Sequence, residues 1–265
     1  MFRSLLISSL LLLLAACGGN NAENKDNVLR VGATAVPHAE ILEQAKPLLE
    51  KQGIKLEVIV FNDYVQPNVQ LAEGRLDANY FQTKPYLDEF NQARKTTLVP
   101  VQGIHVEPLG AYSRRHASLA ELPRNATVAL PNDASNTGRS LLLLQQAGLI
   151  GLKRGQNHLQ TVADIGSNPR GFVFRELEAA TLPRVLDQVD LAVINTNYAL
   201  DAGLSPAKDA LALETADSPY VNYLVSRAEN KDDKRLLALA SVLKGDEVRA
   251  FIAAKYAGAV ISAGP

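Results

Sequence analysis

The sequence has only one cysteine, Cys17, and four histidines, His38, His105, His116 and His158. A single cysteine excludes a disulfide bridge within the chain, so the fold must depend on its hydrophobic core. The histidines are scattered and show no HExxH pair or other metal-ligand spacing, and the sequence has neither a GxSxG elbow nor a P-loop. These absences argue against an enzyme and against a bound metal or cofactor.

The chain also lacks an excess of charge of either sign. It contains 27 Lys and Arg residues and 28 Asp and Glu residues, for a formal net charge of −1. A nucleic-acid partner would require a basic face, so this balance argues against one. The composition, 47% hydrophobic and 21% charged, is that of a soluble globular protein, and 265 residues suffice for one large α/β domain or two lobes.

The N-terminus has the three parts of a signal peptide. Arg3 supplies a positive charge, an apolar run from Leu5 to Leu14 is broken only by two serines, and Leu14-Ala-Ala-Cys17 follows. Polar residues come directly after Cys17, so the apolar run is shorter than the roughly 20 residues of a spanning helix. Residues 1–16 are therefore predicted to be a cleaved signal peptide.

The Leu14-Ala-Ala-Cys17 sequence is similar to a bacterial lipobox, which implies that Cys17 is acylated and becomes the first mature residue. Each buried CH₂ of an acyl chain contributes about 0.8 kcal/mol, so several chains would hold the protein at a membrane. Residues 17–27, which are polar and rich in Asn, would be a lipidated tether. The alternative is an ordinary cleavage site beside an unmodified cysteine. The prediction is a membrane-anchored lipoprotein that faces the periplasm or the cell surface.

Short segments rich in β-branched and aromatic residues alternate with amphipathic segments, which is the pattern of an α/β protein with mostly parallel sheets. Strands are predicted at Leu29–Thr34, Lys55–Phe61, Leu76–Phe81, Leu109–Ser113, Thr127–Pro131, Phe172–Leu177, Leu191–Asn195 and Val221–Arg227. Helices are predicted at Pro37–Gln52, Val65–Ala72, Pro85–Ala93, Gly138–Ala147, Leu182–Gln188, Asp232–Leu243 and Glu247–Tyr256.

Two irregular stretches, Pro100–Pro108 and Ala210–Pro219, lie where this alternation pauses. They are predicted to connect two lobes. The first lobe would combine residues 28–108 with 219–265, and the second would be residues 109–218.

Arg139 lies near the predicted start of a helix, after a buried strand and a polar turn that contains Asn136 and Gly138. A helix N-terminus favours an anion because its N–H groups are unpaired. A guanidinium can also bind a carboxylate through two parallel hydrogen bonds. Arg139 is therefore a candidate carboxylate-binding residue; the alternative is a surface arginine beside a capping loop.

Amide side chains form the second group of candidates. Asn195 and Asn197 follow an apolar strand, and ligands of open α/β sheets bind outside the carboxyl ends of strands. Asn222 lies beside a strand that begins after a predicted interlobe connection. An amide can donate to a carboxylate and accept from an ammonium group. The alternatives are that the first two amides cap a helix and that Asn222 forms a turn.

Aromatic residues form the third group. Tyr64, Phe81 and Tyr86 follow strand ends, where they could line an apolar slot for a ligand side chain, and a thioether makes favourable contacts with ring edges. Ordinary core packing is the alternative.

Five segments together resemble the methionine-binding lipoprotein family, also called the NlpA or MetQ lipoproteins. They are Phe61-Asn-Asp-Tyr-Val-Gln-Pro-Asn68, Leu76-Asp-Ala-Asn-Tyr-Phe-Gln-Thr-Lys-Pro-Tyr-Leu87, Pro131-Asn-Asp-Ala-Ser-Asn-Thr-Gly-Arg-Ser140, Leu191-Ala-Val-Ile-Asn-Thr-Asn-Tyr198 and Ser218-Pro-Tyr-Val-Asn222. The resemblance implies a type II periplasmic-binding-protein fold with a ligand cleft between two α/β lobes. It also implies that the protein captures L-methionine for the permease and ATPase of an ABC importer.

The resemblance assigns the ligand carboxylate to Arg139 and the amino-acid backbone groups to Asn197 and Asn222. Asn195 is a further candidate because the alignment can slip between the two amides. Tyr64, Phe81 and Tyr86 would enclose the ligand side chain. Thr83 replaces the histidine that family members commonly carry there, so a methionine-containing dipeptide or another small amino acid is an alternative ligand. A surface-exposed interaction or adhesion lipoprotein is an alternative of another class.

Overall fold

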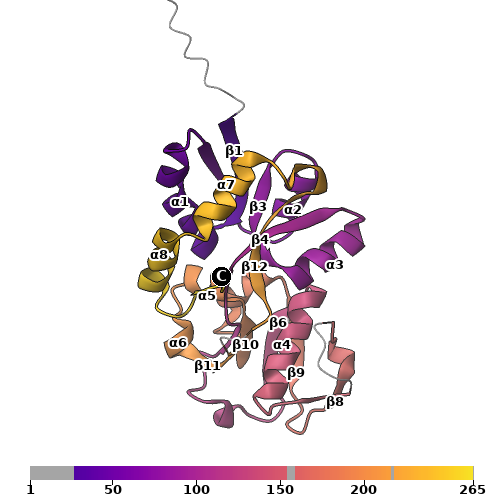
Figure 1. Ribbon diagram of the computed structural model, residues 1–265. Helices are drawn as coiled ribbons and strands as arrows, with labels where there is room; N and C mark the ends of the chain where they lie inside the picture. The colour runs from indigo at the N-terminus through magenta and orange to yellow at the C-terminus, as the bar shows by residue number, and fades with distance from the viewer. Residues whose placement is uncertain (1–26, 154–158, 216–217, 265) are drawn as a thin grey trace, which may run out of the picture.

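The computed structural model describes residues 27–153, 159–215 and 218–264. The predicted signal peptide, Cys17 and nearly all of the predicted tether lie outside these ranges. Within these ranges, no helix combines the length and apolar character needed to cross a membrane. Figure 1 shows two α/β lobes, as the sequence predicts: the indigo and yellow ends of the chain share one lobe, and the pink and orange middle forms the other.

A six-stranded sheet forms the centre of the first lobe. Its strands are β1 (Val28–Thr34), β2 (Lys55–Phe61), β3 (Ala78–Thr83), β4 (Leu98–Val106), β12 (Val221–Arg227) and β13 (Ile261–Ser262). Their order across the sheet is β13-β4-β12-β3-β1-β2. β2 and β3 run parallel to β1, whereas β12 runs antiparallel to β3 and β4. The late strand β12 therefore completes the middle of a sheet that the N-terminal segment begins.

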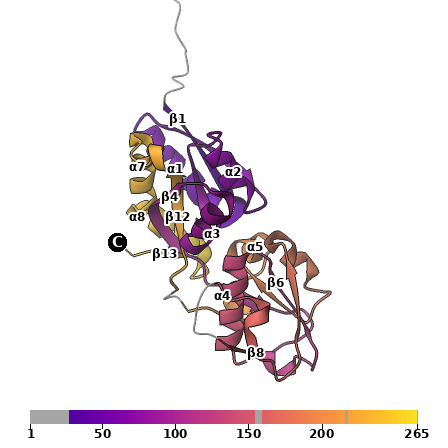
Figure 2. The same cartoon turned by 90° about the vertical axis from the view of Figure 1, so that its right-hand side faces the viewer.

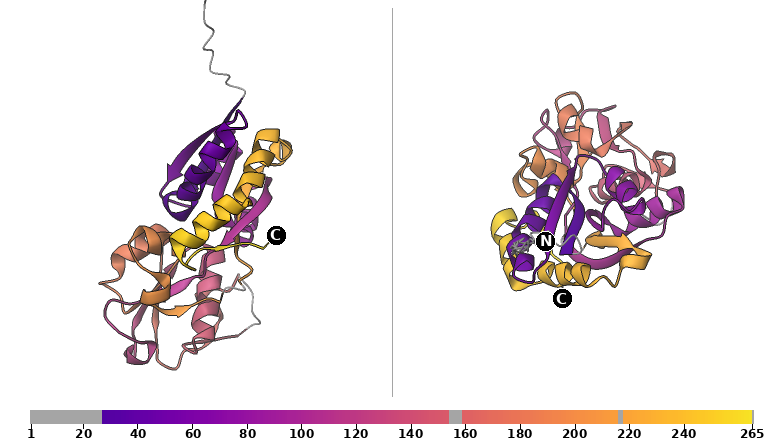
Figure 3. Two further views of the ribbon diagram at one scale, coloured as in Figure 1. Left: turned by 60° about the vertical axis from the view of Figure 1, so that its left-hand side comes forward. Right: turned by 90° about the horizontal axis from the view of Figure 1, so that it is seen from above.

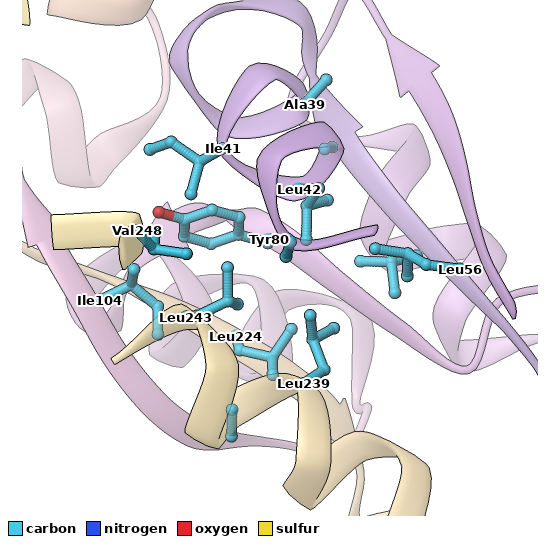
Figure 4. Packing of buried hydrophobic residues seen from close by; sticks show 14 of the residues in the cluster. Ala39, Ile41, Leu42, Leu56, Tyr80, Ile104, Leu224, Leu239, Leu243 and Val248 are labelled. Atoms are coloured by element: carbon cyan, nitrogen blue, oxygen red, sulfur yellow. The ribbon is translucent and has the colours of Figure 1, made fainter. Parts of the chain in front are cut away.

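Helices cover both faces of this sheet. On one face, α1 (Glu40–Glu50), α7 (Lys234–Leu243) and α8 (Asp246–Tyr256) bury Leu42, Leu239 and neighbouring side chains against the strands, as Figure 4 shows. The other face carries α2 (Gln66–Ala72) and α3 (Lys84–Arg94). Successive side chains of a strand point to opposite faces, so Leu224 joins the first core and Val225 the second. Figure 3 shows the yellow C-terminal helices beside the indigo N-terminal segments.

A five-stranded sheet forms the second lobe. Its strands are β5 (Gly110–Tyr112), β6 (Thr127–Pro131), β9 (Val173–Leu177), β10 (Leu191–Ile194) and β11 (Ala210–Leu213), in the order β11-β5-β10-β6-β9. Helix α4 (Ala134–Gln146) packs in one core, and the 3-10 helix η5 (Ala179–Val185) and α5 (Thr196–Asp201) pack in another. The smaller elements are β7 (Gly151–Leu152), β8 (Ile165–Ser167), α6 (Pro206–Asp209) and the turns η2 (Ala35–Ala39), η3 (Leu119–Glu121), η4 (Val162–Asp164) and η6 (Ala228–Asn230).

The two irregular connections predicted from the sequence are shorter than expected. Most of Pro100–Pro108 belongs to β4, and the first residues of Ala210–Pro219 form β11. Pro100 and Gly103 weaken the strand pattern of β4, yet its pairing with β12 accommodates them through register shifts. Within the described residues, the chain thus passes between the lobes after β4 and after β11. Figure 2 shows the two lobes one above the other.

The two passages between the lobes are joined by hydrogen bonds. The Glu214 N–H donates to the Leu109 carbonyl at 2.9 Å, and the Leu109 N–H donates to Glu214 Oε2 at 2.9 Å. The lobe boundaries at 108/109 and 218/219 stay a prediction, which the membership of the two sheets supports.

Two helix predictions are corrected by the structure. Helix α4 begins at Ala134 rather than Gly138, because the Asp133 side chain accepts a hydrogen bond from the Asn136 N–H and caps the helix there. The segment predicted as a helix at Leu182–Gln188 is instead the end of the 3-10 helix η5 (Ala179–Val185), which contains Pro183, followed by a turn.

Candidate functional site

A small cavity lies at the junction of the lobes and is lined by residues of both. All eight residues predicted from the sequence line it: Tyr64, Phe81, Thr83, Tyr86, Arg139, Asn195, Asn197 and Asn222. The structure also places His38, Gln82, Glu107, Asn136 and Thr196 around it. Among the eight predicted residues, Tyr64 and Asn222 are 158 positions apart in the chain, yet they meet at one cavity. The contacts of these residues with a ligand stay a prediction.

The aromatic residues line the cavity from the first lobe. Phe81 is on β3, Tyr86 is on α3, and Tyr64 follows β2. The Tyr64 ring centroid lies 5.8 Å from that of Phe81 and 5.7 Å from that of Tyr86. Tyr198, on α5 of the second lobe, lies 5.0 Å from Tyr64, so rings of both lobes meet here. The aromatic slot predicted from the sequence is a cluster of rings between the lobes.

Arg139 lies inside α4 and is buried rather than on the surface. Its Nε and Nη2 donate to the two oxygens of Glu214 at 2.9 and 2.6 Å, and Nη2 also donates to the Glu107 carbonyl at 2.7 Å. The guanidinium stacks 4.2 Å from the centroid of Tyr220. Burial lowers the pKa of Arg139, but the Glu214 carboxylate outweighs burial and raises it above the ordinary value.

These contacts leave one side of the guanidinium for a ligand. Among the described residues, Nη1 of Arg139 makes no hydrogen bond. Glu214 therefore holds the guanidinium of Arg139 in place, and the N–H groups of Nη1 are available to a second carboxylate.

The amides of Asn197 and Asn222 use their oxygens in contacts with the protein. Asn197 Oδ1 accepts from the Tyr64 hydroxyl at 2.5 Å, and Asn222 Oδ1 lies 3.1 Å from His38 Nε2. Their Nδ2 groups are thus left to donate within the cavity. Asn222 belongs to β12 and not to a turn. Asn195 occupies the N-cap position of α5, but its side chain makes no capping hydrogen bond.

Asn195 has a side-chain oxygen without a partner. Its Nδ2 donates to Asn136 Oδ1 at 2.9 Å, and its Oδ1 is buried with no hydrogen-bond partner among the described residues. The orientation follows from Asp133, whose carboxylate can only accept and therefore receives the Asn136 Nδ2 at 2.9 and 3.0 Å. Asn136 then presents its oxygen to Asn195. The cavity thus contains an acceptor that lacks a donor.

A buried cluster of His38, His105 and Glu107 lies at the cavity, although the sequence suggested that the histidines are scattered. Glu107 Oε1 is 2.7 Å from His105 Nε2 and 3.2 Å from His38 Nε2. Burial lowers the pKa of His38 to about 4 and that of His105 to about 3, so both are neutral at pH 7. Burial raises the pKa of Glu107, and His38 and Arg139 oppose this effect.

These three side chains are near enough to one another to hold a metal ion, since their ligand atoms lie within 4.8 Å. Hydrogen bonding favours another role. Where Glu107 is ionised, it can only accept, so both Nε2 atoms that face it donate to it and have no lone pair left for a metal. The Nδ1 atoms then accept from Thr34 Oγ1, at 2.7 Å, and from the Tyr80 hydroxyl. The cluster is therefore a set of neutral imidazoles that hold a carboxylate.

Comparison with known proteins identifies the family. The model of the NlpA lipoprotein family matches residues 29–264. The chain belongs to the NlpA lipoprotein family. The type II periplasmic-binding-protein fold predicted for it agrees with this membership and with the solved structures of similar proteins.

Similar proteins of the NlpA lipoprotein family cover nearly the whole chain. The D-methionine-binding lipoprotein MetQ of Escherichia coli K12 is 45% identical over 238 residues, 89% of this chain and 88% of MetQ. A nutrient-binding protein from Burkholderia cenocepacia, solved bound to methionine, has a TM-score of 0.86 and 45% identity over 89% of this chain and 100% of that one. The lipoprotein Tp32 of Treponema pallidum has a TM-score of 0.87 and 43% identity over 90% of this chain and 100% of that one.

Sequence reasoning missed His38, His105, Glu107 and Glu214 in this member of the NlpA lipoprotein family. Glu107 and Glu214 stand in the passages between the lobes, which the sequence marks only as irregular stretches. A charged residue beside Pro108, directly after the β-branched run of β4, is the local signal that could have pointed to Glu107.

Proposed function

We propose that this lipoprotein captures methionine in the cavity between its lobes and delivers it to the permease and ATPase of an ABC importer. The observation that carries the proposal is the meeting of Arg139, Asn197 and Asn222 with an aromatic cluster at one cavity. The three polar groups offer donors for a carboxylate. The rings offer an apolar slot in which a thioether can contact ring edges.

Closure of the lobes is part of the proposal. The lobes, predicted as residues 28–108 with 219–265 and residues 109–218, would close over the ligand. The two adjacent passages after β4 and β11 would act as the hinge. Closure would present one composite surface to the permease, so the ligand-dependent geometry would be the signal for transport. In this proposal the protein is the substrate-binding component of the importer and not an enzyme.

The test is to identify the ligand and to measure its binding. Mass spectrometry of the compounds released by denaturing the purified protein should find methionine. Calorimetric titration of ligand-free protein should then give saturable binding of L-methionine, with D-methionine and a methionine-containing dipeptide as comparisons and alanine as the control. Release of another amino acid or a dipeptide, without measurable heat from either methionine enantiomer, would contradict the proposal.

Cys17→Ser should release the protein from the membrane. Acylation of Cys17 would supply the anchor, and the described residues contain no spanning helix that could replace it. Fractionation of cells that produce the variant should find the protein outside the membrane fraction, whereas the unaltered protein sediments with the membranes. Ala22→Ser, within the predicted tether, is the control. A variant that stays in the membrane fraction would show that something other than Cys17 attaches the protein.

Tyr64→Phe should weaken methionine binding by about 0.5–1.5 kcal/mol, roughly a factor of 2 to 10. The hydroxyl of Tyr64 donates to Asn197 Oδ1 and so directs the amide nitrogen into the cavity. The ring itself, and its packing, are kept in the variant. Calorimetry measures the change, with Tyr223→Phe as a control that removes a hydroxyl from a residue outside the cavity lining. Equal affinities for Tyr64→Phe and the unaltered protein would argue against this orienting role.

A further inference from the structure

The groups proposed to bind the ligand carboxylate all face the cavity as donors. Arg139 has no acceptor, and the oxygens of Asn197 and Asn222 are already occupied by Tyr64 and His38. An amino acid also carries an α-ammonium group, which needs acceptors and a negative charge. These three residues therefore account for only one half of a zwitterionic ligand.

Glu107 is the one acidic side chain among the described residues that line the cavity, and it is only 5% exposed. Arg139 is a cation that lines the same cavity, but it is already paired with Glu214 through two hydrogen bonds. Its Oε1 faces His38 and His105, which hold it as neutral donors and bring no positive charge. Among the described residues, the buried carboxylate thus has no cation of its own, and burial without one is costly.

Asn195 provides a second, independent observation. Asn195 lines the same cavity as Glu107, and its Oδ1 is buried without a donor among the described residues. A buried acceptor without a partner is uncommon and costs free energy. A ligand N–H group in the cavity would satisfy it.

We propose that Glu107 is the counter-charge for the α-ammonium group of the ligand and that Asn195 Oδ1 is a further acceptor for it. The proposal rests on methionine capture and deepens it. Arg139 and Glu107 would give the cavity a positive and a negative end, so it would select amino acids over carboxylic acids with the same side chain. His38 and His105 would act as positioning residues that fix the carboxylate.

The experiment compares L-methionine with 2-hydroxy-4-(methylthio)butanoate, in which a hydroxyl replaces the ammonium group. Glu107→Gln keeps the shape of the side chain and an oxygen that can accept from the histidines, but it removes the charge. The variant should bind L-methionine about 30-fold or more weakly. Its affinity for the hydroxy acid should change by less than about threefold, since that ligand brings no cation. Glu176→Gln, an exposed carboxylate on β9, is the matched control and should leave both affinities unchanged.

Equal losses of affinity for both ligands in Glu107→Gln would mark a structural role and overturn the proposal, as would an unchanged affinity for methionine. Failure of the unaltered protein to bind methionine would instead refute the proposed function. If Glu107→Gln does not fold, a crystal structure of the unaltered protein with L-methionine decides. An ammonium nitrogen within hydrogen-bond distance of a Glu107 carboxylate oxygen supports the proposal, and one beyond about 3.5 Å overturns it.

Discussion

Arg139→Ala should reduce the free energy of methionine binding by about 2–5 kcal/mol, a loss of roughly 30-fold to several-thousand-fold in affinity. The ligand carboxylate would enter a buried site without the charge that offsets its desolvation. The guanidinium is held by Glu214, by the Glu107 carbonyl and by the Tyr220 ring, so it is fixed before the ligand arrives. Little ordering free energy would then be lost on binding. Calorimetric titration with L-methionine measures the effect.

The Arg139→Ala variant also leaves Glu214 without its partner, which can itself destabilise the protein by about 3–5 kcal/mol. Two controls separate this effect from the loss of a ligand contact. The double variant Arg139→Ala with Glu214→Gln removes the unpaired charge and should recover stability but not affinity. Arg139→Lys keeps the charge without the planar fork and should bind with intermediate affinity. If Arg139→Ala, alone or combined with Glu214→Gln, folds and binds methionine as the unaltered protein does, the carboxylate-binding role is refuted.

The fold was most predictable where a segment has its own periodic pattern. β2, β6 and β12 begin and end at the predicted residues, because β-branched and apolar side chains make up most of each segment. β4 was missed because Pro100 and Gly103 interrupt its pattern, and only its partners β12 and β13 make it a strand. Similarly, the start of α4 depends on the side-chain cap of Asp133, which the polar composition of the turn concealed. Local sequence patterns predict helices and strands that have their own periodicity. The other strands and helix ends depend on contacts that the local pattern does not show.

The candidate site also divides into residues that the sequence predicts and residues that only the structure reveals. Residues within long motifs, such as Arg139 and Asn197, were predicted from the resemblance to a family. Glu107 and the two buried histidines were not, because their role depends on a network that assembles three elements: η2, β4 and β12. The sequence separation of 184 residues between His38 and Asn222 gives no local signal of their contact. Hydrogen-bond partners of buried polar groups were therefore accessible only from the structure.

Acidification from pH 6.5 to about 4 should lower the free energy of unfolding, and His38 and His105 should account for much of the slope. Their pKa values are lowered by burial to about 4 and about 3, against an ordinary value near 6.5. Over this pH range the unfolded chain binds a proton at each histidine that the folded chain does not. Each site therefore contributes stability above pH 6.5 and loses about 1.4 kcal/mol per pH unit as the pH falls. The raised pKa of Glu107 acts in the opposite direction, because the folded state takes up that proton first, so the net loss is smaller.

Denaturant unfolding at a series of pH values measures this slope, and His105→Asn isolates one contribution. Burial alone lowers the pKa of His105, so its replacement should make the slope between pH 6.5 and 4 shallower by up to about 1.4 kcal/mol per pH unit. The variant also loses the contacts with Tyr80 and Glu107, which lowers stability at every pH but does not by itself add a slope. His116→Asn, which removes a histidine beside Asp190 outside this network, is the matched control. Parallel stability curves for His105→Asn and the unaltered protein would mean that His105 is not held neutral by the fold.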